Sequence, residues 1–176
     1  MTGTRDRQQS IRSVSIVETS LLPSAQSLIH RDREIALRDL EASSVFEPCG
    51  DFSRGGSGGT AGGGPYDLTL SVEDGRLVFR TLTASGEALP ILVLSLKPYR
   101  RLIKDYFLIV RSYDEAMREG KPSRIEAIDM GRRGLHNEGA GLLIERLEDK
   151  ITMDLDTARR LFTLICVLHG GITALR

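Results

Sequence analysis

The clearest pattern of hydrophobic and polar positions lies between Tyr66 and Leu96. Apolar residues first recur at every second position, which is the period of a half-buried strand. Two short polar pairs, Asp74-Gly75 and Ser85-Gly86, separate the segments and suit tight turns. The pattern therefore predicts an antiparallel β-meander. Because the run from Leu89 to Leu96 is nearly all apolar, we expect that strand to be the central or most covered one.

A second alternation, Ile11 to Val17, predicts an N-terminal strand. Apolar residues spaced three and four apart predict helices at residues 24–43, 98–119, 123–149 and 154–168. Ser123 and Glu126 have the spacing of a capping box, and Asp154 is a further N-cap candidate. We expect Gly170-Gly171 to end the last helix.

These elements predict an α+β fold, in which a small antiparallel meander packs against C-terminal helices beside one N-terminal strand and helix. We expect one domain over residues 11–169, between a flexible terminus at 1–10 and a tail at 170–176. The helix side chains expected to meet the sheet, and the sheet residues that they meet, are Tyr106, Phe107, Val110 and Phe162, with Leu68, Leu70, Phe79 and Val93.

The segment Gly50 to Gly64 contains eight glycines. Such a composition cannot bury much apolar surface, so we expect a disordered insert. A glycine-rich loop can also bind phosphate when it follows a strand and precedes a helix. Here a strand follows and no Gly-Lys-Ser/Thr ending is present, which disfavours a phosphate loop.

Charge is balanced along the 176 residues, with 24 Lys and Arg against 24 Asp and Glu. This balance argues against a protein that mainly coats nucleic acid or an anionic membrane, so a nucleic-acid partner is possible but not favoured. No apolar run approaches the ~18 residues of a membrane span, and the first ten residues lack the apolar segment of a secretory signal. We therefore expect a cytoplasmic protein with no membrane partner.

The two cysteines, Cys49 and Cys166, form no Cys-x-x-Cys pair, so neither a disulfide framework nor a zinc knuckle is indicated. Cys166 and His169 lie three residues apart on one predicted helix, but two ligands do not make a metal site. We expect neither a metal nor a cofactor.

Charged residues cluster near the middle of the predicted helix 123–149. At about 100° per residue, one side of this helix carries, beside an apolar arc, Asp129, Arg132, Arg133 and His136, and Asn137 belongs to the same segment. Arginines can hold a carboxylate or phosphate with two hydrogen bonds, and a histidine beside charged groups can titrate near neutral pH. The alternative is an intrahelical salt-bridge ladder without a ligand.

The helix 98–119 carries a basic stripe, made by Arg100, Lys104 and Arg111, opposite its apolar side. A solvated surface is the simpler interpretation, and contact with a phosphate or an acidic partner is the alternative. We include Arg100 and Lys104 in the candidate binding site as helpers of the 129–137 cluster, although the helical wheel places them on the solvent side of their own helix.

Three long segments resemble an alphaproteobacterial family, the uncharacterised protein family number 0262: residues 96–107, 125–139 and 156–169. The likeness covers residues 11–169 without the glycine insert. It implies membership of the family and assigns no catalytic role. The insert Gly50 to Gly64 looks longer than the family pattern, and the tail 172–176 is specific to this chain. Neither is therefore expected to be essential.

The sequence leaves the biochemical function unknown, with three hypotheses open. The first is a binding or regulatory module that recognises an anionic ligand or protein partner, whose affinity should fall steeply with salt. The alternative is a small enzyme that acts on a phosphorylated or carboxylated metabolite with His136 as general acid or base, which a concave pocket holding His136 would favour. The third is a structural subunit of a larger assembly.

Overall fold

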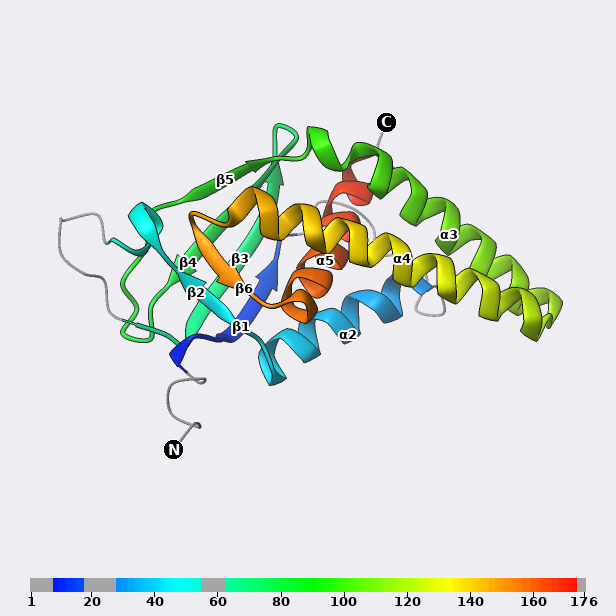
Figure 1. Cartoon of the computed structure of the whole chain (residues 1–176), viewed down its shortest axis with the longest axis horizontal. Coiled ribbons are helices and arrows are strands. Elements are labelled where there is room, and N and C mark those ends of the chain that lie inside the picture. The colour runs from blue at the N-terminus through cyan, green and yellow to red at the C-terminus, as the bar shows by residue number, and fades with distance from the viewer. Residues whose placement is uncertain (1–7, 18–27, 55–62, 174–176) are drawn as a thin grey trace.

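The computed structural model describes residues 8–17, 28–54 and 63–173 (Figure 1). Its elements, in chain order, are β1 (Ile11–Ile16), α2 (Leu28–Ala42), β2 (Phe46–Pro48), the 3-10 turn η1 (Gly50–Ser53), β3 (Tyr66–Glu73), β4 (Arg76–Leu82), β5 (Leu92–Ser95), the 3-10 turn η2 (Lys97–Tyr99), α3 (Arg100–Glu119), α4 (Pro122–Leu147), β6 (Ile151–Met153) and α5 (Leu155–Thr173). The predicted α+β class is confirmed.

The main sheet has the strand order β1-β3-β4-β5. Strands β3, β4 and β5 are antiparallel neighbours, as the meander prediction requires, and β1 pairs with β3 in parallel. The turn between β3 and β4 has positive φ at both central residues, 53° at Asp74 and 72° at Gly75, which matches the twist of the flanking strands. Figure 1 shows this sheet at one end of the molecule, with the paired helices α3 and α4 extending away from it.

The prediction that Leu89–Leu96 forms the central strand is wrong. Because β1 occupies the far side of β3, the centre of the sheet falls at β3 and β4, and β5 lies at the edge. Strand β5 buries only one of its faces: Leu92 and Leu94 are buried, whereas Val93 is 49% exposed. Val93 therefore does not belong to the core, contrary to its predicted place.

The remaining predicted core residues are buried, apart from Phe107, which is partly buried against them. One hydrophobic cluster includes Leu68, Leu70, Phe79, Tyr106, Val110 and Phe162. Helix α5 is the central helix of this arrangement, because it packs on α2, α3, α4 and β3. Helix α4, which carries the charged 129–137 segment, and the buried face of the sheet therefore share one core.

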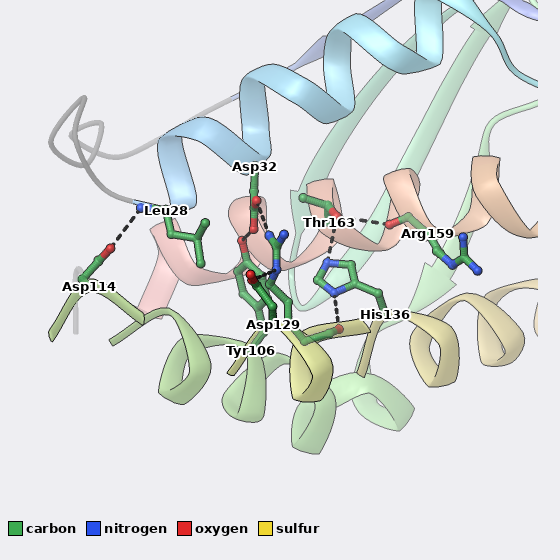
Figure 2. Close-up of polar contacts among 9 residues, drawn as sticks. Leu28, Asp32, Tyr106, Asp114, Asp129, His136, Arg159 and Thr163 are labelled. Atoms are coloured by element: carbon green, nitrogen blue, oxygen red, sulfur yellow. Dashed lines mark hydrogen bonds and ion pairs between the residues drawn. The ribbon is translucent and has the colours of Figure 1, made fainter. Parts of the chain in front are cut away.

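Helix α2 is held along the sheet and against α3 by side-chain bonds to backbone groups. The backbone N–H of Val14 in β1 donates to Glu41 at 3.1 Å, and that of Ile11 donates to Ser44 at 2.9 Å. At the other end of α2, the Leu28 N–H donates to Asp114 of α3 at 3.2 Å (Figure 2). These bonds fix the face that α2 presents to α4 and α5.

Two predicted helix ends differ from the structure. Helix α4 begins at Pro122 with Lys121 as N-cap, so the capping box is wrong. Asp154 does cap α5, since its carboxylate accepts the Thr157 N–H at 2.9 Å. However, α5 continues through Gly170-Gly171 to Thr173. A Cβ at Gly170 would collide with the Phe107 ring of α3. That glycine permits close helix packing instead of ending the helix.

The first part of the predicted disordered insert is ordered. Gly50–Ser53 forms a 3-10 turn, and Phe52 within it is 3% exposed and belongs to the core. This turn directly follows β2, which the sequence pattern did not predict and which pairs with β6 in a separate two-stranded sheet. Residues 55–62 of the insert lie outside the described residues, whereas its last two, Gly63 and Gly64, are described, and the Gly63 carbonyl accepts a hydrogen bond from the Ala84 N–H at 3.1 Å.

The predicted flexible terminus and tail fall largely outside the described residues, at 1–7 and 174–176. The nearest described residues are bonded to the domain. The carbonyls of Gln9 and Ser10 accept hydrogen bonds from Phe46 at 2.7 Å and Tyr66 at 2.8 Å. The start of the predicted helix 24–43, at 24–27, also lies outside the described residues.

We expect Val110→Asp to abolish cooperative folding, because it would place an unpaired carboxylate at a position that is 5% exposed. Val93→Asp is the matched control, and it should lower the free energy of unfolding by less than about 1 kcal/mol because the β5 edge is exposed. Urea unfolding followed by circular dichroism measures both. Equal effects of the two substitutions would contradict the placement of α3 and β5.

We expect Gly139→Ala in α4 to lower the free energy of unfolding, because its Cβ would lie 2.6 Å from the Phe162 ring of α5. Gly134→Ala in the same helix has no neighbour within 4 Å and should stabilise by about 0.5–1 kcal/mol through helix propensity. Thermal unfolding of the two variants measures this difference. A stabilising Gly139→Ala would mean that α4 and α5 pack less closely than described.

Candidate functional site

Helices α2, α4 and α5 enclose a pocket of about 540 Å³. Among the described residues that line it are two adjacent arginine pairs, Arg132-Arg133 on α4 and Arg159-Arg160 on α5. Three aspartates, one histidine, one asparagine and one threonine share the wall: Asp32, Asp39, Asp156, His136, Asn137 and Thr163. The pocket thus combines charged groups with apolar surface, to which Ile35 and Ala36 contribute, and carries one more arginine than aspartate.

A buried carboxylate stands at the base of the pocket. Asp32 of α2 is 8% exposed and accepts two hydrogen bonds, from the Tyr106 hydroxyl of α3 at 2.8 Å and from Arg132 Nη1 of α4 at 2.5 Å (Figure 2). Burial, followed by the Asp32 charge, raises the pKa of Tyr106 well above its ordinary value, so its hydroxyl keeps its proton and donates. Three helices therefore meet at one carboxylate.

Arg132 has its position set by this carboxylate. Burial alone would lower the pKa of Arg132, but the Asp32 carboxylate and its hydrogen bond outweigh burial and the pKa is raised. Asp129, one turn earlier on α4, is a weaker partner, with 3.8 Å between its oxygen and Arg132 Nε. The Arg132 side chain is 29% exposed and contributes a fixed positive charge to the pocket wall.

His136 bridges α4 and α5. Its Nδ1 lies 2.8 Å from the Arg132 carbonyl and therefore carries the proton that this oxygen accepts, while Nε2 lies 3.0 Å from Thr163 Oγ1 (Figure 2). The ring stands edge-to-face between Tyr106 and Phe162, with centroid distances of 5.7 and 5.6 Å. Burial lowers the pKa of His136, which favours the neutral ring.

The arginines of the pocket differ in how far they are already paired. Arg159 bonds Asp156 at 2.6 Å and Asn137 at 2.7 Å, and Arg160 lies 3.8 Å from Asp39. Arg133 is exposed and has neither an ion pair nor a hydrogen bond with any described residue. Arg133 is thus the cation of the pocket wall that is free to meet a ligand.

The structure brings together only part of the predicted site. Four of its residues line the pocket: Arg132, Arg133, His136 and Asn137. Asp129 does not line the pocket but forms an ion pair with Arg132. Arg100 and Lys104 do not line it. Both are exposed on α3, and the Arg100 charge acts instead on His169, whose pKa is lowered by burial and then by this arginine.

The alternative interpretation, a ladder of salt bridges within α4, explains little of how Arg132 is paired. Its Asp129–Arg132 contact is long, and the short partner of Arg132 comes from α2. The cluster is therefore built mainly between helices, which a wheel of one helix cannot reveal.

Several pocket residues were missed because they come from other helices: Asp32, Asp39, Asp156, Arg159, Arg160 and Thr163. A signal for Asp32 exists in the sequence. The buried positions of α2 are Leu28, Asp32, Ala36 and Leu40, which recur every four residues, so one charged residue interrupts an apolar stripe. A buried carboxylate requires partners, and that requirement marks Asp32 as a candidate.

Two other kinds of site are absent from the described part of the chain. It contains no cluster of three or more His, Cys, Asp or Glu side chains placed to hold a metal ion. Its helices include none with the length and apolar character needed to cross a bilayer.

Comparison with known proteins identifies the family. The model of the uncharacterised protein family UPF0262 matches residues 8–170. The chain belongs to this family. Its matched span includes the pocket and the Asp32 cluster, and it begins before β1 and ends within α5.

Bacterial members of the family are similar over most of the chain. A UPF0262 protein of Allorhizobium ampelinum is 52% identical over 141 residues, which are 80% of this chain and 83% of that protein. One from Caulobacter vibrioides is 50% identical over 159 residues, 90% of this chain and 92% of that protein. No solved structure matches the chain significantly.

We expect Asp32→Ala to lower the free energy of unfolding by about 3–5 kcal/mol, because it leaves the Tyr106 hydroxyl and the Arg132 guanidinium without their buried partner. Asp39→Ala is the control on the same helix and the same pocket. Asp39 is 30% exposed, and its partners are Arg38 at 3.3 Å and Arg160 at 3.8 Å, so its loss should cost less than about 1 kcal/mol. Denaturant unfolding compares them, and similar costs would contradict the central place given to Asp32.

Proposed function

We propose that this protein is a binding or regulatory module whose pocket between α2, α4 and α5 recognises an anion, either a small ligand or an acidic group of a partner. The observation that carries the proposal is Arg133, a cation of the pocket wall without a partner among the described residues. It stands beside three further arginines that line the same space. Guanidinium groups match carboxylate and phosphate oxygens with paired hydrogen bonds.

The fixed position of Arg132 supports this proposal. Because Asp32, which also accepts a hydrogen bond from Tyr106, holds Arg132 from within the core, little side-chain entropy remains to be lost when Arg132 binds a ligand. A guanidinium has five N–H donors, and the bond to Asp32 uses one of them. Its partly buried position also lowers the local dielectric, which strengthens its attraction for an anion.

The enzyme hypothesis receives less support. The pocket does hold His136, as that hypothesis requires. However, a general acid or base must reach the proton of its substrate, and both nitrogens of His136 already lie within hydrogen-bond distance of protein groups. We therefore assign the pocket to binding rather than to acid–base catalysis.

A cytoplasmic location is part of the proposal. Both cysteines of the chain are free thiols, Cys49 partly exposed and Cys166 buried. Free thiols are typical of reducing compartments, where disulfides rarely persist.

We expect wild-type protein to bind sulfate, a probe with the charge of the proposed ligand class, in low-salt buffer by isothermal titration calorimetry. Arg133→Gln should weaken the sulfate Kd about tenfold or more, since a hydrogen bond to a charged group contributes about 1.5–3 kcal/mol. Lys104→Gln is the control, because Lys104 is an exposed cation outside the pocket. Added NaCl should weaken binding to the wild type.

Two results would count against this function. If the wild-type protein bound no sulfate at low salt, the proposed anion-binding function would be wrong. Sulfate binding that Arg133→Gln leaves intact, while Lys104→Gln weakens it, would move the site to the basic stripe of α3.

A further inference from the structure

We propose that His136 couples anion binding to proton uptake, so that the pocket binds anions more tightly as the pH falls. This inference rests on the proposed function, because it describes the regulation of the same pocket. It needs no free nitrogen on His136, only a change in its protonation when a negative charge arrives nearby.

The hydrogen bonds around His136 contain one acceptor too many for the neutral ring. Thr163 has a single hydroxyl proton, yet its oxygen lies 3.0 Å from His136 Nε2 and 3.1 Å from the Arg159 carbonyl. When His136 is neutral, Nε2 and this carbonyl compete for that proton. When Nε2 is protonated, it donates to Thr163, and the hydroxyl then donates to the carbonyl. With the ring protonated, His136 Nε2, the Thr163 hydroxyl and the Arg159 carbonyl each have a hydrogen-bond partner.

The Nδ1 side fits both protonation states equally. Nδ1–H donates to the Arg132 carbonyl at 2.8 Å whether or not Nε2 carries a proton. Protonation therefore requires no rotation of the ring and no movement of α4 against α5. The hydroxyl of Thr163 is the group that reorients.

Charges from every surrounding helix act on this equilibrium. Burial opposes the imidazolium and lowers the pKa of His136, and the positive charges of Arg132 on α4 and Arg159 on α5 lower it further. The Arg132 carbonyl and the Asp32 carboxylate on α2 raise it. Tyr106 on α3 contributes a ring in edge contact whose hydroxyl stays protonated.

An anion in the pocket changes the balance in one direction. It would meet Arg133 in the pocket that Arg132 and Arg159 also line, and its charge would offset the charge of these two cations that oppose protonation. The pKa of His136 must then rise on binding. By linkage, a group whose pKa is higher in the complex takes up a proton when the complex forms, and affinity rises as the pH falls toward the pKa of the free protein.

Sulfate is the probe for the test, because its charge does not change between pH 5.5 and 8. We expect the sulfate Kd to tighten as the pH falls across this range, by at most about tenfold per pH unit for one linked proton. Calorimetry in two buffers of different ionisation enthalpy should show proton uptake on binding. His136→Asn keeps a donor for the Arg132 carbonyl and should remove both effects.

His169→Asn is the matched control. His169 is a second histidine with a pKa lowered by burial, and it is not among the residues that line the pocket. This variant should keep the pH dependence of the wild type. The ring signals of His136, assigned by comparison with His136→Asn, should titrate at a higher pH with saturating sulfate than without it in nuclear magnetic resonance spectra.

The outcomes separate this inference from the proposed function. Sulfate binding with one Kd at every pH, and no change in the His136 titration, would overturn the coupling and leave the anion site standing. A pH dependence that survives in His136→Asn would overturn it as well, since the proton would bind elsewhere. Absence of sulfate binding at any pH would overturn both.

Discussion

The burial of one carboxylate organises the helical half of this protein. Asp32 stands in the apolar stripe of α2, where a charge without partners would be strongly destabilising. Its partners come from two other helices, the Tyr106 hydroxyl from α3 and the Arg132 guanidinium from α4. The requirement to satisfy this carboxylate therefore sets how α2, α3 and α4 approach one another, and the hydrophobic contacts around it fill the space that this approach defines.

The pocket follows from the same requirement. Once Arg132 turns inward to Asp32, the adjacent Arg133 points from the same turn of α4 toward solvent, and the two form an inner and an outer cation. The second arginine pair, on α5, faces them across the space and is partly neutralised by Asp156 and Asp39. The resulting wall combines apolar surface with paired charges and is only slightly positive, which fits a chain with no formal net charge.

The sequence predicted correctly the features that depend on a local pattern, and it did not predict those that depend on contacts with distant segments of the chain. Alternation and an Asp-Gly turn identified β3 and β4, and the wheel of α4 grouped Arg132, Arg133 and His136. The position of β5 could not be predicted in this way, because it depends on β1 joining the far side of β3. The burial of Phe52 could not be predicted, because the glycines that follow it indicate a disordered segment. The role of Asp32 depends on partners that lie 74 and 100 residues away in the sequence.

The same distinction bears on His136, whose chemistry depends on the helix opposite. On the wheel it is a histidine beside charged residues, a description that suits an acid or a base. In the fold, one nitrogen faces a carbonyl of its own helix and the other a threonine of α5, so the ring joins two helices. Because His136 also lines the pocket, the coupling proposed above would let an anion and the proton act on each other through the charges of Arg132 and Arg159.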